Sequence, residues 1–432
     1  MIQRPLIIIL TALIVALSPR TFAQEQSAKS PRQPVQTAIR AARLLDVKTG
    51  ALINNAVVLI EGERISAVGS GLSIPAGAKV IDLGDMTLLP GLVDSHTHLL
   101  ASSASEYGRM LLTKSQAYRA LEGASNARRT LLAGYTAVRD VESEGSGYAD
   151  VALRDAINHG LVEGPRMQVA TRSIAIIGQM EPFDISPDLP DFPHGAQMIS
   201  GVEEARRAVR EQIGYGADLI KIFADGRYPT MTIEEISVIV EEAHKAGRRV
   251  AAHAATTIGI RNAVTAGVDS IEHGFRVDRA TLELMKQKGV WLVPTYQRRF
   301  EQVEAITDDE IRPRARASIA AVQKMLQIAR ELGVKIVTGS DPGDEKHHGA
   351  NAREIEAFTT IGFTNLEAIR AGTISGAELM GWQDRIGSLE TGKFADMIAV
   401  GGNPISDIKQ LQNVSFVMKG GVVVKDELRV GK

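Results

Sequence analysis

The 432-residue sequence contains no cysteine. The chain can therefore form no disulfide bond, and its stability must come from a buried core and from subunit contacts. The same absence removes thiolates from the metal ligands that the chain can offer. An excess of positive charge is also missing, because 49 basic residues stand against 51 acidic ones. Nucleic acid is therefore not an expected partner.

Low-complexity tracts and long apolar runs are also missing from most of the chain. The apolar run at residues 6–17 is shorter than the ~20 residues of a membrane helix. Arg4 precedes this run and residues 21–23 follow it, which predicts a signal peptide cleaved after Ala23, with an uncleaved anchor as the alternative. No cysteine follows, which excludes lipoprotein attachment. We expect a periplasmic or secreted protein without a stable membrane span.

The composition that remains is that of a globular protein. Hydrophobic residues make up 44% of the chain and charged residues 23%. Cleavage after residue 23 would remove Arg4 and Arg20, leaving 47 basic residues against 51 acidic ones and a net charge of −4. A (β/α)8 barrel needs only about 250 residues, so the length predicts one barrel and a smaller domain.

Strand patterns gather at the two ends of the chain. Short apolar or alternating runs between Gly and Asn residues lie at 38–40, 56–60, 64–68, 79–82, 395–400, 414–419 and 422–424. We expect both ends to build one small β-sandwich. Between them, strand-like runs alternate with helical patterns at 115–133, 201–215, 233–246 and 315–332. This alternation predicts an α/β fold with a parallel sheet. A Pro- and Asp-rich stretch at 182–193 predicts a loop over the pocket face.

Two histidines, His96 and His98, end the apolar run at 88–94. Side chains at positions i and i+2 of a strand share a face, so both imidazoles would point into one pocket. Imidazole suits zinc and its neighbours in the first transition series. The alternative is a pair of ordinary strand-end histidines.

Further candidate ligands recur at the ends of strand-like runs. His253 closes the run at 249–254, His273 closes that at 267–274, and Asp341 follows that at 333–340. Lys221 lies within the apolar run 218–223. Taken alone, such a lysine more often extends to solvent or pairs with a carboxylate. In a (β/α)8 barrel, however, the carboxyl ends of the strands converge, which predicts one shared pocket.

This ordered set of residues resembles the amidohydrolase superfamily, in its two-metal type with a carboxylated lysine. The segments 89–98 and 387–400 resemble the same family, and the resemblance covers nearly the whole mature chain. Within the superfamily the chain is most similar to the prolidase- and dipeptidase-like branch, which includes amidohydrolases that degrade ochratoxin A. The resemblance implies a (β/α)8 TIM barrel with a small β-sandwich domain built from both termini. The expected parts are a signal peptide (1–23), a linker (24–36), the sandwich (37–88 and 385–432) and the barrel (89–384).

The resemblance also implies two divalent metal ions, with zinc as the expected metal. His96, His98 and Asp341 would hold the first ion, and His253 and His273 the second. Lys221 would bridge them as a carbamate, together with a hydroxide. Burial disfavours the ammonium form of a lysine, and a neutral amine can react with carbon dioxide. Asp341 would also act as base and then as acid. Its alternative role is a carboxylate that caps the next turn.

The candidates for substrate binding lie in the loops that follow the strands. They are Arg227, Tyr228, Tyr296, Arg298, His347 and His348. Arginine and protonated histidine could bind a substrate carboxylate, and Tyr296 with Phe300 could line an apolar wall. The alternatives are ordinary surface charge and packing. His159, His194 and His244 receive no role.

The resemblance implies a hydrolase that releases the C-terminal amino acid from N-acyl amino acids or dipeptides. Ochratoxin A, cleaved to ochratoxin alpha and phenylalanine, is included. Two loops depart from the dipeptidase pattern, since 177–180 replaces a Gly-Gly-His stretch and 223–228 replaces Ser-Gly-Gly. These departures argue against ordinary dipeptides as the preferred substrate.

Several alternatives stay open at this point. They are an Xaa-Pro or Xaa-Arg/Lys dipeptidase, a cyclic amide hydrolase or deaminase, and a scaffold without catalysis. Lys221 favours the two-metal hydrolase, because deaminases of the superfamily usually keep one metal and lack the lysine. A homo-oligomer, such as an octamer, is expected from the resemblance alone.

Overall fold

The computed structural model describes residues 36–101, 106–179, 188, 193–226 and 231–429. The predicted signal peptide and the linker up to residue 35 lie outside these residues. The same holds for most of the predicted loop at 182–193 and for two substrate-binding candidates, Arg227 and Tyr228. Within the described part, no helix is both long enough and apolar enough to cross a membrane.

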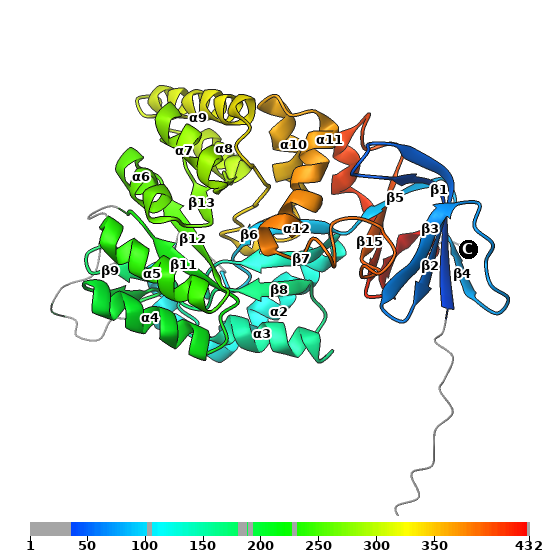
Figure 1. The fold of residues 1–432 in the computed structure, drawn as a ribbon, viewed down its shortest axis with the longest axis horizontal. Coiled ribbons are helices and arrows are strands. Elements are labelled where there is room, and N and C mark those ends of the chain that lie inside the picture. The colour runs from blue at the N-terminus through cyan, green and yellow to red at the C-terminus, as the bar shows by residue number, and fades with distance from the viewer. Residues whose placement is uncertain (1–35, 102–105, 180–187, 189–192, 227–230, 430–432) are drawn as a thin grey trace, which may run out of the picture. The chain divides into compact units, whose positions relative to one another are not determined.

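One mixed sheet joins the two ends of the described chain (Figure 1). Its strands are β1 (Gln36–Leu45), β2 (Leu52–Glu61), β3 (Arg64–Ser70), β4 (Lys79–Asp82), β5 (Met86–Pro90), β15 (Met397–Gly401), β16 (Val414–Lys419) and β17 (Val422–Asp426). The order is β17-β16-β15-β5-β1-β2-β3, and β4 pairs with β1. Strands from both ends therefore pair in one sheet, while the sandwich and the domain boundaries stay predictions.

Strand β5 connects the early strands of this sheet with the late ones. It pairs in parallel with β1 and antiparallel with β15. Alternate residues of β15 enter different clusters of buried side chains, because successive side chains point to opposite faces. Ile398 belongs to the largest cluster, which it shares with the parallel strands, and Met397 to a second cluster among the sheet's own strands. Both faces of β15 are therefore packed.

The remaining named strands pair in parallel. They are β6 (Leu92–Thr97), β7 (Tyr135–Asp140), β8 (Arg166–Val169), β9 (Ile174–Ile176), β10 (Gln197–Ile199), β11 (Leu219–Phe223), β12 (Arg249–Ala254), β13 (Ser270–His273) and β14 (Trp291–Val293). They form two sheets, in the orders β6-β7-β8 and β10-β9-β11-β12-β13-β14. The strands pair in parallel and alternate with helices, as predicted. They form two separate sheets, however, and not one continuous closed barrel.

A segment around Ile336 lies between the free edges of these two sheets. Ile336 forms a parallel bridge with Leu292 of β14. On the other side, the backbone N–H of Ser95 in β6 donates to Thr338 at 3.1 Å, and the N–H of Asp341 donates to the carbonyl of His96 at 2.9 Å. The segment thus places Asp341 directly beside the histidine strand.

Helices follow most of the parallel strands. They are α1 (Tyr107–Thr113), α2 (Gln116–Leu132), α3 (Ala149–Asn158), α4 (Val202–Gly214), α5 (Ile233–Lys245), α6 (Thr257–Ala266), α7 (Arg279–Lys288), α8 (Tyr296–Glu304), α9 (Arg312–Leu332), α10 (Ala352–Thr360), α11 (Asn365–Ala371) and α12 (Ile374–Met380). The helices predicted at 115–133, 201–215, 233–246 and 315–332 correspond to α2, α4, α5 and α9, whose ends differ from the predicted ones by at most three residues. α5 starts sharply because Thr232 and Glu235 form a reciprocal capping box.

The packing of the helices orients the side chains of the strands between them. Ile220 and Ile222 of β11 are buried in the same apolar cluster as Ile236 and Ile239 of α5. Because side chains alternate along a strand, Lys221 points to the opposite face. That face is the wall of a cavity.

Candidate metal centre

The six predicted ligands come together at one end of the parallel strands. Five of them line a single cavity of about 350 Å³, namely His98, Lys221, His253, His273 and Asp341. His96 lies directly beside the cavity, with its Nε2 atom 3.2 Å from Nε2 of His98. Side chains that lie up to 243 positions apart along the sequence, His98 and Asp341, therefore share one pocket.

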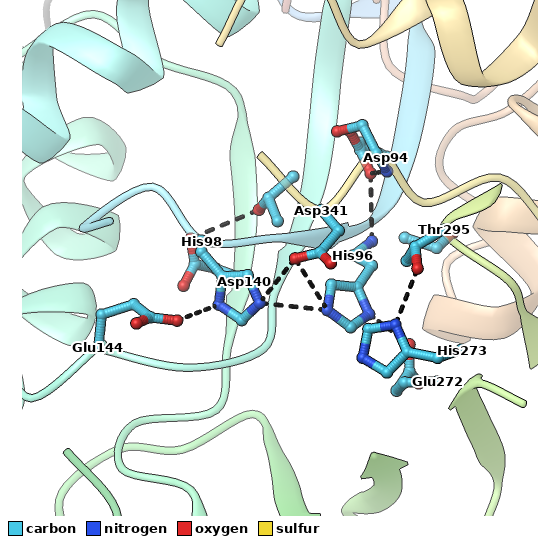
Figure 2. A network of polar contacts seen from close by, with 12 residues as sticks. Asp94, His96, His98, Asp140, Glu144, Glu272, His273, Thr295 and Asp341 are labelled. Carbon is cyan, nitrogen blue, oxygen red and sulfur yellow. Dashed lines mark hydrogen bonds and ion pairs between the residues drawn. The ribbon is translucent and has the colours of Figure 1, made fainter. Parts of the chain in front are cut away.

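The distances around Asp341 suit a shared cation. Its Oδ1 atom lies 3.4 Å from Nε2 of His98 and 3.8 Å from Nε2 of His96 (Figure 2). Ligand atoms of His96, His273 and Asp341 all lie within 4.8 Å of one another. The ring centroids of His253 and His273 are 4.6 Å apart, which brings the fourth imidazole to the same centre.

Three of the four histidines have their other ring nitrogen engaged by the protein (Figure 2). Nδ1 of His96 lies 2.7 Å from Glu272, and Nδ1 of His98 lies 2.9 Å from Glu144. Nδ1 of His273 lies 2.8 Å from the hydroxyl of Thr295. The hydrogen bonds of His96 and His273 select one tautomer of each ring. All three contacts leave Nε2 available to a metal.

The protonation of these groups also suits a cation. Burial lowers the pKa of His96 to about 4 and that of His273 to about 3, so both rings are neutral at pH 7. Burial acts in the same direction on His98, but the carboxylates of Glu144 and Asp341 outweigh it and raise the pKa of that ring. The space between His98 and Asp341 therefore favours a positive charge. Neutral imidazoles and one carboxylate form a donor set that fits zinc or a similar ion.

Lys221 is 1% exposed, and burial lowers the pKa of its amine from the ordinary value. Among the described residues its Nζ atom makes no ion pair, although Glu272, Glu142 and Asp341 are close enough to raise its pKa. The alternative in which Lys221 pairs with a carboxylate therefore finds no support here. A buried amine of lowered pKa is suited to reaction with carbon dioxide.

Glu272 connects the histidine cluster to a buried arginine. Its Oε1 atom accepts hydrogen bonds from Arg139 at 2.7 Å and from Ser270 at 2.5 Å. Burial raises the pKa of Glu272, but the Arg139 guanidinium and the hydrogen bond from His96 outweigh burial and hold it well below its usual range. Glu272 is therefore an ionised carboxylate that orients His96.

We expect the substitution Glu272→Gln to weaken zinc binding by about 10- to 100-fold. Substituting a residue that hydrogen-bonds to a metal-bound histidine typically lowers metal affinity by this amount. Competition with a chromogenic chelator measures the affinity. Glu283→Gln changes a half-exposed carboxylate of α7 and is the matched control. A thermal melt checks folding, since the buried Arg139 loses its ionic partner. Unchanged zinc affinity in a folded variant would contradict the assigned role.

Strained backbone is concentrated around the cluster. Outside glycine, the described residues contain six with positive φ, and four of them are site residues: Glu144 (53°), His273 (71°), Thr295 (45°) and Asp341 (48°). Each such conformation costs on the order of 1–3 kcal/mol and persists only where the surroundings impose it. The fold therefore holds these side chains in position at a cost in stability.

The candidates for substrate binding are divided among several places. Arg298 lines the cavity together with Arg299. Nε2 of His347 lies 3.5 Å from Arg298, and His347 lines two adjoining cavities rather than this one. The other two candidates within the described residues, His348 and Tyr296, are buried elsewhere. His348 lines a separate cavity beside β16, and the hydroxyl of Tyr296 accepts a hydrogen bond from Gln323 at 2.6 Å.

Sequence reasoning missed several residues of the cavity wall. Tyr107, Glu142, Glu144, Phe275, Thr295, Arg299 and Gln302 all line it. A signal existed for two of them, because Glu142 and Glu144 follow β7 with the same i, i+2 spacing as the histidines that end β6.

Comparisons with known proteins agree with this geometry. A sequence profile described as "Amidohydrolase family" matches residues 87–424. The chain is 32% identical over 426 residues to an ochratoxinase from Aspergillus niger, which covers 89% of this chain and 86% of that protein.

Two solved structures extend the comparison. A Xaa-Pro dipeptidase with methionine bound in its active site has a TM-score of 0.82 and 34% identity, covering 90% of this chain and all of that one. The A. niger ochratoxinase structure has a TM-score of 0.80 and 30% identity, covering 91% of this chain and 96% of that one.

Proposed function

The chain belongs to the amidohydrolase family and is a hydrolytic enzyme, and from that premise we propose that it releases the C-terminal amino acid from N-acyl amino acids or dipeptides. The observation that carries the proposal is the cavity in which His98, Lys221, His253, His273 and Asp341 meet. Two relatives supply the substrate classes, one named an ochratoxinase and the other a Xaa-Pro dipeptidase.

We also propose that the parallel strands form the closed (β/α)8 barrel expected from the sequence. Support comes from the segment around Ile336, which bonds to β14 on one side and to β6 on the other. On the opposite side, the N–H of Asp218 donates to the carbonyl of Val169 in β8 at 2.8 Å, directly before β11. Hydrogen bonds thus cross both gaps between the two parallel sheets.

In the proposed metal centre, His96, His98 and Asp341 would hold one divalent ion, and His253 and His273 would hold the other. Lys221, carboxylated at Nζ, would be a further ligand of the ions. When bound, the ions would ionise a water near neutral pH and polarise the scissile carbonyl. Glu272, Glu144 and Thr295 contact the Nδ1 atoms of three histidines and would hold their Nε2 atoms in position for the metal.

Asp341 would carry the proton during the reaction. Burial raises the pKa of this carboxyl, but the hydrogen bond to His98 and the nearby histidines outweigh burial and hold it far below its ordinary value. The side chain is therefore ionised and can accept a proton at a carboxylate oxygen. It would take that proton from the attacking water and give it to the departing amine nitrogen, so that Asp341 returns to its starting state.

Arg298 and Arg299 would bind the carboxylate of the released amino acid. Both line the cavity from α8, next to the histidine cluster. Arg299 makes no ion pair within the described part of the chain, whereas Arg298 lies 3.7 Å from Asp344. Arginine suits this role, because its planar guanidinium binds a carboxylate through two parallel hydrogen bonds.

The proposed function is tested by amino acid release from a defined substrate panel. Zinc-loaded protein is incubated with ochratoxin A, N-acyl phenylalanines and Xaa-Pro and Xaa-Arg dipeptides, and free amino acid is quantified by chromatography. We expect release from at least one class. Cleavage of dipeptides alone favours the dipeptidase as the second candidate, in line with the structural neighbour of that name. Release from none of them, with two metals bound per chain, refutes the proposal.

Removal of the metal is expected to abolish this release. Dialysis against a chelator should leave a folded protein without measurable activity, because the bound metal is what would lower the pKa of the attacking water toward neutrality. Addition of two equivalents of zinc should restore the rate, with metal content measured by atomic absorption. Full activity at less than 0.1 metal per chain, roughly the level of trace contamination, would contradict a metal mechanism.

A further inference from the structure

The cavity contains a buried carboxylate that the proposed mechanism does not use. Glu142 follows β7, lines the cavity and is 3% exposed. Its Oε1 atom accepts a hydrogen bond from the hydroxyl of Ser173 at 2.6 Å. Within the described part of the chain it makes no ion pair. A buried carboxylate without a cationic partner is unfavourable, since desolvation penalises its charge.

Three further polar groups of the wall, Glu144, His98 and Tyr107, lie near Glu142. Oxygen atoms of Glu142 and Glu144 and a ring nitrogen of His98 all lie within 4.8 Å of one another. The phenolic oxygen of Tyr107 lines the same cavity, is shielded from solvent and has no hydrogen-bond partner among the described residues. Two carboxylates at this distance repel each other, and a positive group placed here would relieve this repulsion and satisfy the hydroxyl.

An organic cation fits this place better than a third metal ion. Nδ1 of His98 is already 2.9 Å from Glu144, and Nε2 of the same ring faces Asp341. A metal beside Glu142 would have to take Nδ1 from Glu144 and remove the proton that fixes the ring. An ammonium group, in contrast, donates hydrogen bonds to carboxylates and to a phenolic oxygen without displacing any existing contact.

We propose that Glu142, with Glu144 and Tyr107, binds a cationic nitrogen on the acyl side of the scissile amide. This rests on the proposed function, because the scissile carbonyl must lie at the histidine cluster. The α-ammonium of an aminoacyl group is two bonds from that carbonyl carbon, so it falls beside His98, where Glu142 lies. The carboxylate of the other half would meet Arg298 and Arg299.

The consequence is a preference for dipeptides with a free amino terminus over N-acyl amino acids. Ochratoxin A has no ammonium next to its scissile carbonyl and would leave Glu142 without a partner. The departures at 177–180 and 223–228 argue against ordinary dipeptides, and the buried carboxylate argues for them. The charge of the cavity wall, rather than the sequence of these loops, would decide whether dipeptides or N-acyl amino acids are preferred.

A matched substrate pair isolates this charge. Glycyl-phenylalanine and N-propionyl-phenylalanine have the same size and release the same amino acid, but a methyl group replaces the ammonium in the second. We expect the kcat/KM of the zinc-loaded enzyme to favour the glycyl compound by about 10- to 100-fold, the range for a hydrogen bond to a charged group. In Glu142→Gln the ratio should fall to below about threefold, because the neutral amide keeps only part of the polar contact.

Controls separate the subsite from the fold and from the metal centre. Glu241→Gln, an exposed carboxylate of α5, should keep the wild-type ratio. Tyr107→Phe removes only the hydroxyl and should lower the ratio about threefold, which provides a second variant should Glu142→Gln fail to fold. Metal content is measured for every protein, with two zinc ions per chain expected throughout.

The outcomes are distinguishable. Hydrolysis of neither compound, together with no release from any member of the substrate panel, refutes the proposed function itself. Equal hydrolysis of both by the wild type overturns the cation subsite and leaves the amidase intact. A wild-type preference that persists in folded Glu142→Gln overturns the assignment to Glu142. A third zinc ion that disappears in Glu142→Gln shows a metal site and overturns the organic cation.

Discussion

The substitution Asp341→Asn is expected to lower kcat by about a thousandfold while the protein stays folded, since a general acid–base group contributes about 10²- to 10⁴-fold. Asparagine keeps the shape of the side chain but cannot carry the proton from water to the leaving amine. The Oδ1 atom of Asp341 also lies 3.4 Å from Nε2 of His98, so the variant should lose part of its zinc affinity as well. Steady-state rates with the best substrate of the panel measure the effect.

Excess zinc separates the two contributions of Asp341. Saturating zinc restores any activity that is lost through weak zinc binding. The decrease in kcat that remains then measures the contribution of Asp341 to proton transfer. Asp407→Asn, which caps a short helical turn far along the sequence, is the matched control and should retain full activity. Near wild-type kcat in metal-loaded Asp341→Asn would refute the proton role, whatever the zinc affinity.

The substitution Lys221→Ala should be equally severe. It removes a proposed ligand of both ions. Removing a residue that only hydrogen-bonds to a metal ligand lowers metal affinity by up to roughly 100-fold, and the loss in Lys221→Ala should be larger than that. We expect fewer than two zinc ions per chain and no measurable amide hydrolysis. The alanine itself should be tolerated by the fold, because the Lys221 side chain points into the cavity rather than into the apolar cluster.

Carbon dioxide provides an independent test of the lysine. If Lys221 reacts to form a carbamate, metal-free wild-type protein should regain activity with zinc faster when bicarbonate is present. Lys221→Ala should show no such dependence, and Lys409→Ala, a 71% exposed lysine, should behave as the wild type. Reactivation that is independent of bicarbonate, together with an active Lys221→Ala variant, would remove the carbamate from the proposed site.

The sequence was sufficient to bring the candidate ligands to one pocket, for a reason that lies in the fold. Parallel strands all end at the same side of the sheet, so His253, His273 and Asp341 could be placed together from their positions after apolar runs. Four long helices could also be located, because they are periodic and have clear ends. The family itself is confirmed, whereas the metal roles of the ligands stay a prediction.

The residues that surround the ligands could not be identified in this way. Thr295 reaches His273 only because its backbone takes the left-handed conformation at φ 45°, which no sequence pattern indicates. Glu272 precedes His273 in the chain but orients His96, a contact between positions 176 residues apart. Glu142 and Glu144 have the right spacing, yet carboxylates after a strand are too common to be selective without coordinates.

The order of the strands in the sheet could not be predicted from the sequence either. The early strands alternate apolar and polar residues, which identifies them as strands but says nothing of their neighbours. β5 pairs antiparallel with β15, more than 300 positions later in the chain. Such pairing depends on which faces remain after the parallel strands have packed, and a local pattern contains no information about that.

The same pairing sets an order of events during synthesis. β5 leads directly into β6, which contains His96, but the strand that covers its other edge is synthesised more than 300 residues later. Until β15 arrives, that edge presents unpaired N–H and carbonyl groups to any neighbouring chain. Contacts between distant segments also form slowly. Newly made or truncated chains that lack residues from 397 onward should therefore aggregate through β5, and production of this enzyme should benefit from slow expression and low temperature.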